Sequence, residues 1–481
     1  QLNLSNGTEA YTNWKDIPVP LYMRFYVFNV TNPYDVILNA SKPVVREIGP
    51  YTFREKRSKE ILSWDTENGT VQYREIKTYI FDREKSFGTQ DEMVYVINAP
   101  MVGIATMAMQ KLSGLVRPIF MPILSSLLES YNEQLFVNRT VRQILFEGYE
   151  VPLLKDLTNL AKPFFDIPTI LPNNTFGVFY GKNNSDDGIY SVYTGSQGVE
   201  NFALVETWKN KSSLSFWHSK YCNMINGTDG SMFPPFLDKS DTLYIFTTDL
   251  CRSLYLWFEQ ETKVLGIDAY RFTGPDKLFA DPHVDLDNKC FCADPNNCLK
   301  AGVIELTSCQ NGAPVVASGP HFYQGALEYQ SAIDGIKPIK KKHETFLDVE
   351  PLTGLVLNAS KRLQLNIYVR QTPGIIGLQN IHDTIFPLIW LCESAEIDES
   401  SANLFKNQVQ IPMNLGTSIM LAAIVLGSMW TIVALAITAY YCKQARNPRF
   451  IVCQSQERLS TASSTLEEQE APGSPVSGHI K

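Results

Sequence analysis

Cysteines are the residues of this chain best suited to covalent chemistry, and six of its nine lie between positions 222 and 309. An even cluster favours disulfides in an oxidising compartment, although the sequence alone leaves the pairing open. A zinc site is disfavoured, because Cys290-x-Cys292 lacks the usual two-residue spacing and no histidine offers a suitable ligand nearby. The clustered residues are Cys222, Cys251, Cys290, Cys292, Cys298 and Cys309.

Motifs of common catalytic sites are missing from the sequence. There is no Gly-x-Ser-x-Gly elbow, Walker loop, dinucleotide fingerprint or His-Glu-x-x-His, and His343-Glu344 lacks a second histidine four residues after the first. The members of a Ser-His-Asp triad can be scattered along a chain, so a hidden hydrolase stays as an alternative. We expect a protein that is not an enzyme and that has no catalytic residue and no metal.

Apolar and basic residues come together between positions 122 and 142. Ile123, Leu127, Tyr131 and Leu135 recur every four residues, as on one side of a helix. Cations beside an apolar surface would suit amphipathic ligands with anionic head groups. Salt bridges to neighbouring glutamates are the alternative role for the two arginines. The predicted ligand-docking residues are Leu127, Tyr131, Arg139 and Arg142.

Eleven Asn-x-Ser/Thr sequons precede position 415 and none follows it. Such an asymmetry indicates a glycosylated surface on one side of a membrane. The predicted glycosylation sites are Asn3, Asn6, Asn29, Asn39, Asn68, Asn138, Asn173, Asn183, Asn210, Asn226 and Asn358.

An uncharged stretch near the C-terminus predicts a transmembrane helix over residues 415–442. No charged residue occurs between Lys406 and Lys443, and about 20 apolar residues suffice to cross the hydrocarbon core. The alternative is a buried core helix. Basic residues follow at once, so residues 443–481 are predicted to be a disordered cytoplasmic tail. Cys442 and Cys453 would then be candidates for palmitoylation.

The composition of the chain fits a large globular ectodomain over residues 1–414. Hydrophobic residues make up 44% of the chain, which is ample for a core. Asp and Glu number 50 against 42 Lys and Arg, and this mild acidity argues against nucleic acid as a partner.

Most of the predicted ectodomain reads as strands joined by turns. Residues 18–28 form an aromatic-rich strand, residues 60–87 a meander, and residues 177–194 a hairpin. Residues 363–369 alternate apolar and polar side chains as a half-buried strand does. The absence of strand–helix alternation favours a mixed or antiparallel sheet, which could close as a barrel.

Residues 93–162 interrupt this β-rich pattern with a predicted helical bundle. An apolar stretch begins at Met93, Pro122 is predicted to open an amphipathic helix, and Thr140 is expected to cap a second. Residues 151–162 would form a third helix. The fold class is therefore α+β.

Several literal motifs resemble the class B scavenger receptor family, over roughly residues 7–442. This family includes a fatty-acid translocase, a high-density-lipoprotein receptor and a lysosomal integral membrane protein. The motifs that carry the resemblance are Cys222-Asn-Met-Ile-Asn-Gly-Thr228, Cys251-Arg-Ser-Leu-Tyr255, Cys290-Phe-Cys292, Asp348-Val-Glu-Pro-Leu-Thr-Gly354 and Phe386-Pro-Leu-Ile-Trp390.

The resemblance implies an antiparallel β-barrel topped by a helical bundle at residues 93–162 and pierced by an apolar tunnel. It also implies a membrane helix at each end of the intact protein, of which the N-terminal one is absent from this chain. For the disulfide region, residues 222–309, it implies the pairs Cys222–Cys290, Cys251–Cys309 and Cys292–Cys298.

Two departures bear on the subtype within the family. Ser130 and Asn132 stand where the translocase has a lysine pair, and Arg139 stands where the lysosomal member has a histidine. Docking of modified lipoproteins and of a lysosomal hydrolase is therefore not expected to carry over. Residues 6–10 nevertheless resemble the lysosomal branch most.

The function expected from this resemblance is that of a plasma-membrane receptor for lipids and lipoproteins. It would transfer fatty acid, sterol or phospholipid through the tunnel, with bound lipid and N-glycans but no cofactor. The alternative is an endosomal or lysosomal trafficking or adhesion receptor that binds protein ligands at its apex.

Overall fold

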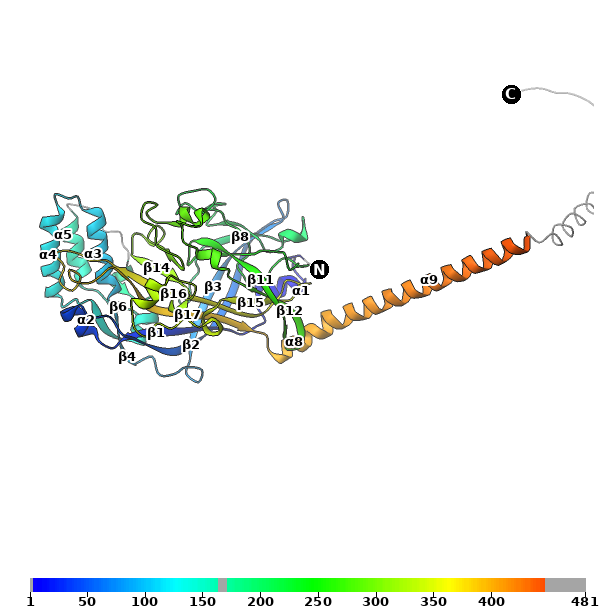
Figure 1. Ribbon diagram of the computed structural model, residues 1–481, viewed down its shortest axis with the longest axis horizontal. Coiled ribbons are helices and arrows are strands. Elements are labelled where there is room, and N and C mark those ends of the chain that lie inside the picture. Colours follow the sequence, from blue (N-terminus) through cyan, green and yellow to red (C-terminus); the bar gives the residue numbers. More distant parts are fainter. Residues whose placement is uncertain (1–2, 163–170, 446–481) are drawn as a thin grey trace, which may run out of the picture. The chain divides into compact units, whose positions relative to one another are not determined.

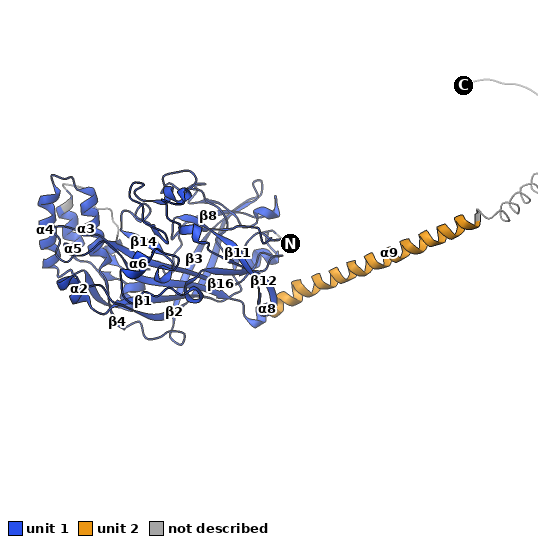
Figure 2. Ribbon diagram, in the orientation of Figure 1, with its two compact units in different colours: residues 1–402 blue, residues 403–481 orange. Residues whose placement is uncertain are grey.

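The computed structural model describes residues 3–162 and 171–445. The chain divides into two units, residues 1–402 and 403–481, which are described separately (Figure 2).

A 13-stranded sheet, in which every pair of named strands is antiparallel, forms the frame of the first unit (Figure 1). Its main path runs β10-β11-β12-β15-β16-β17-β1-β2-β3-β8-β9, with β14 paired to β16 and β13 paired to β14. The strands are β1 (Leu21–Val30), β2 (Val45–Asp65), β3 (Thr70–Asp82), β8 (Ile189–Tyr193), β9 (Val205–Trp208), β10 (Leu243–Thr247), β11 (Arg252–Val264), β12 (Ile267–Thr273), β13 (Val303–Glu305), β14 (Val315–Ser318), β15 (Phe346–Val349), β16 (Val356–Val369) and β17 (Thr384–Glu396).

The two edges of this sheet nearly meet, which makes it barrel-like. The backbone nitrogen of Val205 in β9 donates to Gly227 O at 2.8 Å, and that of Phe246 in β10 donates to Thr228 O at 2.9 Å. Residues 227–228 thus bridge β9 and β10. The predicted antiparallel, mixed α and β architecture is confirmed at this level.

Three helices lie at one end of the sheet (Figure 1): α3 (Ala99–Lys111), α4 (Arg117–Ser130) and α5 (Leu153–Ala161). β4 (Met93–Ile97), which precedes α3, pairs with β5 (Phe136–Thr140), which follows α4. The side chain of Asn98 caps α3 by accepting from Met101 N at 3.1 Å, so the apolar stretch from Met93 is divided into a strand and a helix.

One boundary predicted in this region is wrong. α4 begins at Arg117, with Pro118 in its first turn, so Pro122 lies inside the helix rather than at its start. The cap predicted at Thr140 is confirmed, because Thr140 Oγ1 accepts from Gln143 N at 3.3 Å. The helix that follows is short and ends in the π-helical turn Gln143–Glu147.

The hairpin predicted over residues 177–194 is also wrong. β8 pairs with β3 and β9, whereas the preceding segment hydrogen-bonds elsewhere. The backbone nitrogens of Val178 and Phe179 donate to Ile144 O and Leu145 O, both at 2.8 Å. The ring of Phe179 packs edge-on against that of Phe25, with 4.9 Å between the ring centres. Burial of this aromatic side chain, rather than pairing with a neighbouring strand, therefore determines the position of the segment.

The remaining elements are short apart from α9. They are α1 (Glu9–Lys15), α2 (Pro33–Asn39), β6 (Tyr149–Glu150), β7 (Thr175–Phe176), α6 (Leu327–Ser331), α7 (Lys340–His343), α8 (Glu399–Phe405), α9 (Ile411–Ala445), a π-helical turn Lys406–Gln410, and 3₁₀ turns at Pro172–Asn174, Val199–Asn201, Asp276–Phe279, Leu286–Phe291 and Pro320–Phe322.

α9 contains the apolar segment predicted at residues 415–442. The helical run Glu399–Gln444 is long and apolar enough to cross a membrane, and it is the one such helix among the described residues. Cys442 is exposed on it. The predicted tail from residue 446 onward, including Cys453, lies outside the described residues.

Candidate functional site

α4 exposes apolar side chains on the face opposite to its buried one. Leu115, just before the helix, is 88% exposed, and Ile119 and Ile123 are 67% and 45% exposed. Their spacing of four residues places them in one row, which we call the α4 stripe. The other face of the helix is buried, so packing against the body does not require the stripe. The buried residues of that face include Phe120, Leu124 and Leu128.

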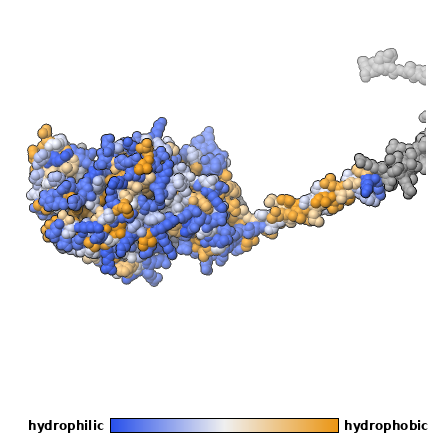
Figure 3. All heavy atoms as spheres, in the orientation of Figure 1, coloured by the Kyte–Doolittle hydropathy of each residue, from blue (hydrophilic) through white to orange (hydrophobic). Residues whose placement is uncertain are grey.

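Figure 3 shows hydrophobic residues on the surface at the end of the first unit where these helices lie. A soluble surface normally scatters large apolar side chains singly, whereas a row of them is typical of a binding surface. The α4 stripe is therefore the strongest candidate for contact with an apolar ligand.

Two of the predicted docking residues continue this row, with different exposure. Leu127 is half-buried and packs against the main core. Tyr131, which follows the helix, is 36% exposed, and its hydroxyl donates to Asp156 Oδ2 in α5 at 2.6 Å. This hydrogen bond raises the pKa of Tyr131 and ties the end of α4 to α5.

The predicted docking arginines make contacts within their own neighbourhood. The Arg139 guanidinium lies 4.6 Å from the centre of the Tyr149 ring and donates to Asn138 O at 2.9 Å. Arg142 Nη2 lies 2.6 Å from Asp91 Oδ1. No described contact joins either guanidinium to Leu127 or Tyr131, so the structure does not bring the four predicted residues together.

The buried face of β2 changes from apolar to charged and back along the strand. Tyr51 and Phe53 belong to the main core, whereas Ile61 packs against a second apolar cluster that contains Trp14. Between them, on the same face, lie Glu55, Arg57 and Lys59. β3 repeats the change, with Glu75 and Lys77 between apolar residues.

These charged side chains and their partners form what we call the ionic band. Its acidic members are Glu55, Glu75, Asp229 and Glu393, and its basic members are Arg57, Lys59, Lys77 and Lys361.

Close contacts run through the whole ionic band. Lys59 Nζ lies 3.0 Å from Glu75 Oε1 and 3.3 Å from Asp229 Oδ2. Arg57 Nε lies 2.7 Å from Glu55 Oε1, and Arg57 Nη2 lies 2.8 Å from Glu393 Oε1. Formal positive and negative charges balance, which is the condition under which buried ions are tolerated.

The pKa values in the band follow from burial and pairing. Burial opposes ionisation of Glu393, but Arg57 and Lys361 outweigh it and lower its pKa to about 2. Glu75 is likewise opposed by burial, yet Lys59 and Arg57 hold its pKa below the usual range. Both carboxylates are therefore charged at neutral pH.

A third cluster joins Glu47, His321 and His343, whose ligand-type atoms lie within 4.8 Å of one another. His321 Nδ1 accepts from Lys337 N at 3.0 Å, and His343 Nδ1 accepts from Ile339 N at 2.9 Å. Each neutral ring therefore carries its proton on Nε2, the atom that would have to bind a metal. This hydrogen bonding disfavours a metal site at the cluster.

Sequence reasoning missed both the ionic band and the histidine cluster. Residues 54–60 are charged at six of their seven positions, on both faces of β2, so the sequence did not single out the face that carries residues 55, 57 and 59. Nothing in the sequence indicated that this face is buried.

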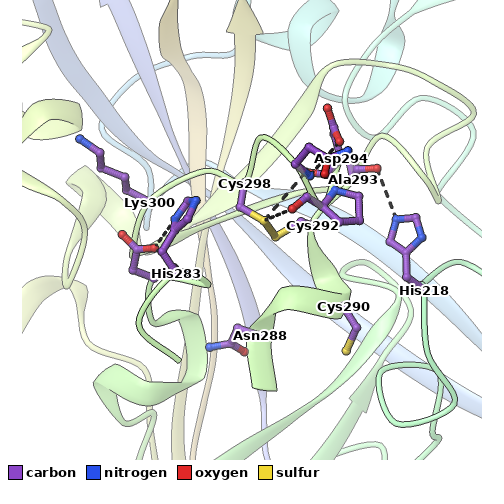
Figure 4. Close-up of a disulfide and its surroundings, with 12 residues drawn as sticks. His218, His283, Asn288, Cys290, Cys292, Ala293, Asp294, Cys298 and Lys300 are labelled. Atoms are coloured by element: carbon purple, nitrogen blue, oxygen red, sulfur yellow. Dashed lines mark hydrogen bonds and ion pairs between the residues drawn. A yellow bond between two sulfur atoms is a disulfide. The ribbon is translucent and has the colours of Figure 1, made fainter. Parts of the chain in front are cut away.

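The disulfide region contains the pairs Cys222–Cys290, Cys251–Cys309 and Cys292–Cys298, which are the pairs that the resemblance implies. In Figure 4, Cys290 points away from the bond between Cys292 and Cys298. The 3₁₀ turn Leu286–Phe291 ends between Cys290 and Cys292 and directs them to different partners. Cys392 is free and buried.

None of the predicted glycosylation sites is buried. The exposed ones are Asn6, Asn39, Asn68, Asn173, Asn183 and Asn210. The half-buried ones are Asn3, Asn29, Asn138, Asn226 and Asn358.

Comparison with known proteins gives a match along almost the whole chain. A family model described as the CD36 family matches residues 1–438. Lysosome membrane protein 2 of Rattus norvegicus is 38% identical over 432 residues, which cover 89% of this chain and 86% of the relative. Scavenger receptor class B member 1 of Rattus norvegicus is 36% identical over 401 residues, which cover 83% of this chain and 75% of the relative.

Proposed function

The chain belongs to the CD36 family, and from this membership we propose that it is a membrane receptor for lipids and lipid-bearing particles, not an enzyme. The α4 stripe would contact the particle, and the interior of the barrel-like sheet would pass lipid toward the bilayer. α9 would hold the receptor in the membrane, with residues 1–414 outside the cell.

The α4 stripe is the observation that carries this proposal. Leu115, Ile119 and Ile123 stay exposed although the opposite face of α4 already supplies the core contacts. Burying one such side chain fully contributes about 1.5–3 kcal/mol, so three of them can provide much of a reversible attachment to a lipid surface.

Partly exposed leucines on two central strands support a lipid passage inside the barrel-like sheet. Leu365 and Leu391 are half-buried although β16 and β17 are central strands of the sheet. Leu391 lies two residues from Glu393 and therefore shares its face with the ionic band. Shielding a lipid on such a route avoids a cost of about 0.8 kcal/mol for each CH₂ exposed to water.

Blocking substitutions test the passage. We expect Leu365→Trp and Leu391→Trp to lower the uptake of a fluorescent phospholipid from particles into cells that express the full chain, while particle binding stays unchanged. Leu62→Trp, on an exposed position of β2, is the matched control and should leave both unchanged. Uptake that survives both interior substitutions would contradict transfer through the sheet.

A trafficking receptor of endosomes or lysosomes is the second candidate. The 38% identity to lysosome membrane protein 2 favours it, and in that case bound lipid would be incidental. Surface biotinylation of cells that express the full chain distinguishes the two locations. A chain found almost wholly inside the cell, with protein cargo whose sorting depends on it, would support this second function over the first.

A further inference from the structure

Arg252, the first residue of β11, has a buried guanidinium without a counterion among the described residues. Only 4% of the residue is exposed. Its Cζ lies 3.5 Å from the centre of the Phe291 ring and 5.7 Å from that of Phe279. These aromatic contacts hold the plane of the guanidinium but do not provide acceptors for its N–H groups in that plane.

Hydrogen bonding satisfies only one edge of this group. Arg252 Nε donates to Ser253 O at a long 3.4 Å, and no other acceptor contacts the guanidinium among the described residues. No carboxylate of the described residues lies within salt-bridge distance of it. Burial lowers the pKa of Arg252 to about 10, so the group is still charged at neutral pH.

The guanidinium lines a small cleft with a volume of about 30 Å³, which is partly open to solvent. Its walls are mostly apolar and include Leu278, Phe279, Phe291 and the Cys292–Cys298 disulfide. Figure 4 shows the loop closed by this disulfide together with Asn288, another residue of the wall.

One acidic side chain, Glu305, also lines the cleft, but it has other partners. Its Oε1 accepts from Thr307 Oγ1 at 2.6 Å and lies 3.6 Å from Arg370 Nη2. Glu305 therefore does not neutralise Arg252. A buried cation beside a cleft without its own anion is costly, and an incoming anion would remove that cost.

We propose that this cleft binds the carboxylate head group of an amphipathic molecule through the guanidinium of Arg252. Arginine donates two parallel hydrogen bonds to a planar carboxylate, and the apolar walls suit the first methylenes that follow it. The site lies in the disulfide region and uses no residue of the α4 stripe, so it goes beyond docking at that stripe.

Binding of carboxyl-¹³C propionate to the full chain in detergent micelles tests the proposal. We expect saturable broadening of the carboxyl resonance, and we expect Arg252→Met to weaken the affinity about tenfold or more, since a hydrogen-bonded charge is lost. Lys300→Met, which removes an exposed cation of the same region, is the control and should leave the affinity unchanged.

A second variant guards against a folding defect in Arg252→Met. Ala280→Trp fills the cleft from its wall while keeping the guanidinium, and it should also weaken propionate binding. Laurate that displaces propionate at this site identifies a lipid head group as the source of the carboxylate. If propionate binds but laurate does not displace it, the proposal that the ligand is an amphipathic molecule is overturned. No saturable binding to the wild type, or binding unchanged in both variants, would overturn the site itself.

Discussion

Arg57 Nη2 on β2 lies 2.8 Å from Glu393 Oε1 on β17, although β1 separates these two strands in the sheet. The pair thus links the N-terminal and C-terminal parts of the first unit through side chains as well as through strand pairing. Because Arg57 also contacts Glu55 at 2.7 Å, one guanidinium serves two buried carboxylates.

Removing this guanidinium should strongly destabilise the first unit. Arg57→Met leaves Glu55 and Glu393 without their shared partner, and breaking a buried pair costs about 3–5 kcal/mol of the free energy of unfolding. Chemical denaturation followed by tryptophan fluorescence measures the change. Arg74→Met is the control: Arg74 and Glu60 form an exposed pair, which contributes about 0–1 kcal/mol. Equal losses in the two variants would contradict a structural role for the ionic band.

Acidification should destabilise the fold through His343. This residue is buried, and burial, together with the neighbouring His321, lowers the pKa of its imidazole to about 4. The unfolded chain, with a histidine pKa near 6.5, then binds more protons between about pH 6.5 and about pH 4. The free energy of unfolding therefore falls as the pH drops through that window, by up to about 3 kcal/mol.

The surrounding charges act on this titration in both directions. Glu47 favours the protonated ring, whereas Arg362 and Lys342 oppose it. Unfolding temperatures at about pH 7 and about pH 5 measure the effect. His343→Asn keeps an acceptor for Ile339 N and cannot titrate, so its unfolding temperature should fall less on acidification. A fall as large as that of the wild type would assign the effect to other groups.

The α4 stripe should determine particle binding without determining stability. Ile119→Asp places a charge on an exposed position, so we expect binding to lipid particles to weaken at least tenfold while the unfolding temperature stays unchanged. Thr158→Asp, an exposed substitution on α5, is the matched control and should leave both unchanged. Surface plasmon resonance on immobilised receptor measures the binding, and calorimetry measures the unfolding temperature. Undiminished binding of Ile119→Asp would exclude the stripe as the docking surface.

Local sequence patterns correctly predicted where some of the strands and turns lie. The run at residues 18–28 became β1, and the meander predicted over residues 60–87 contains the turn near Gly69 that joins β2 to β3. Aromatic spacing and turn residues act within a few positions, so such features can be predicted locally. The pairing of β1 with β17, in which Arg24 lies opposite Cys392, joins residues far apart in sequence. No local periodicity carries that information, so the sequence did not predict this pairing.

Burial was the harder part of the site to predict. Gln364 and Asn366 read as the solvent-facing half of a strand, yet both are fully buried, which makes the half-buried prediction wrong. Asn366 Nδ2 donates to Val316 O at 2.9 Å, and His321 N donates to Gln364 Oε1 at 2.6 Å. β14 and the turn after it thus cover that face. Ile123 and Leu135 were predicted to lie on one side of a helix, yet Ile123 is exposed and Leu135 is buried, because α4 ends at Ser130.

The two longest disulfide loops should contribute more stability than the shortest. Cys251 and Cys309 are 58 residues apart, whereas Cys292 and Cys298 are 6 apart. A cross-link restricts the unfolded chain more when it closes a longer loop, which gives about 4 kcal/mol for the first pair and about 2 kcal/mol for the second. Denaturation of the paired Cys→Ala variants measures the difference, and a larger loss for the short loop would contradict it.

Glycan occupancy should differ between exposed and engaged sequons. The amide nitrogen of Asn358, the atom to which a glycan would be attached, donates to the buried Asp348 Oδ2 at 2.9 Å. Asn210 is exposed in a turn after β9. Because attachment needs a free, accessible amide, we expect Asn210 to be occupied and Asn358 to be empty in protein from mammalian cells. Mass spectrometry of glycopeptides after enzymatic deglycosylation in ¹⁸O water measures both sites, with Asn68 as an exposed reference. An occupied Asn358 would contradict this prediction and would mean that the glycan is attached before the hydrogen bond to Asp348 forms.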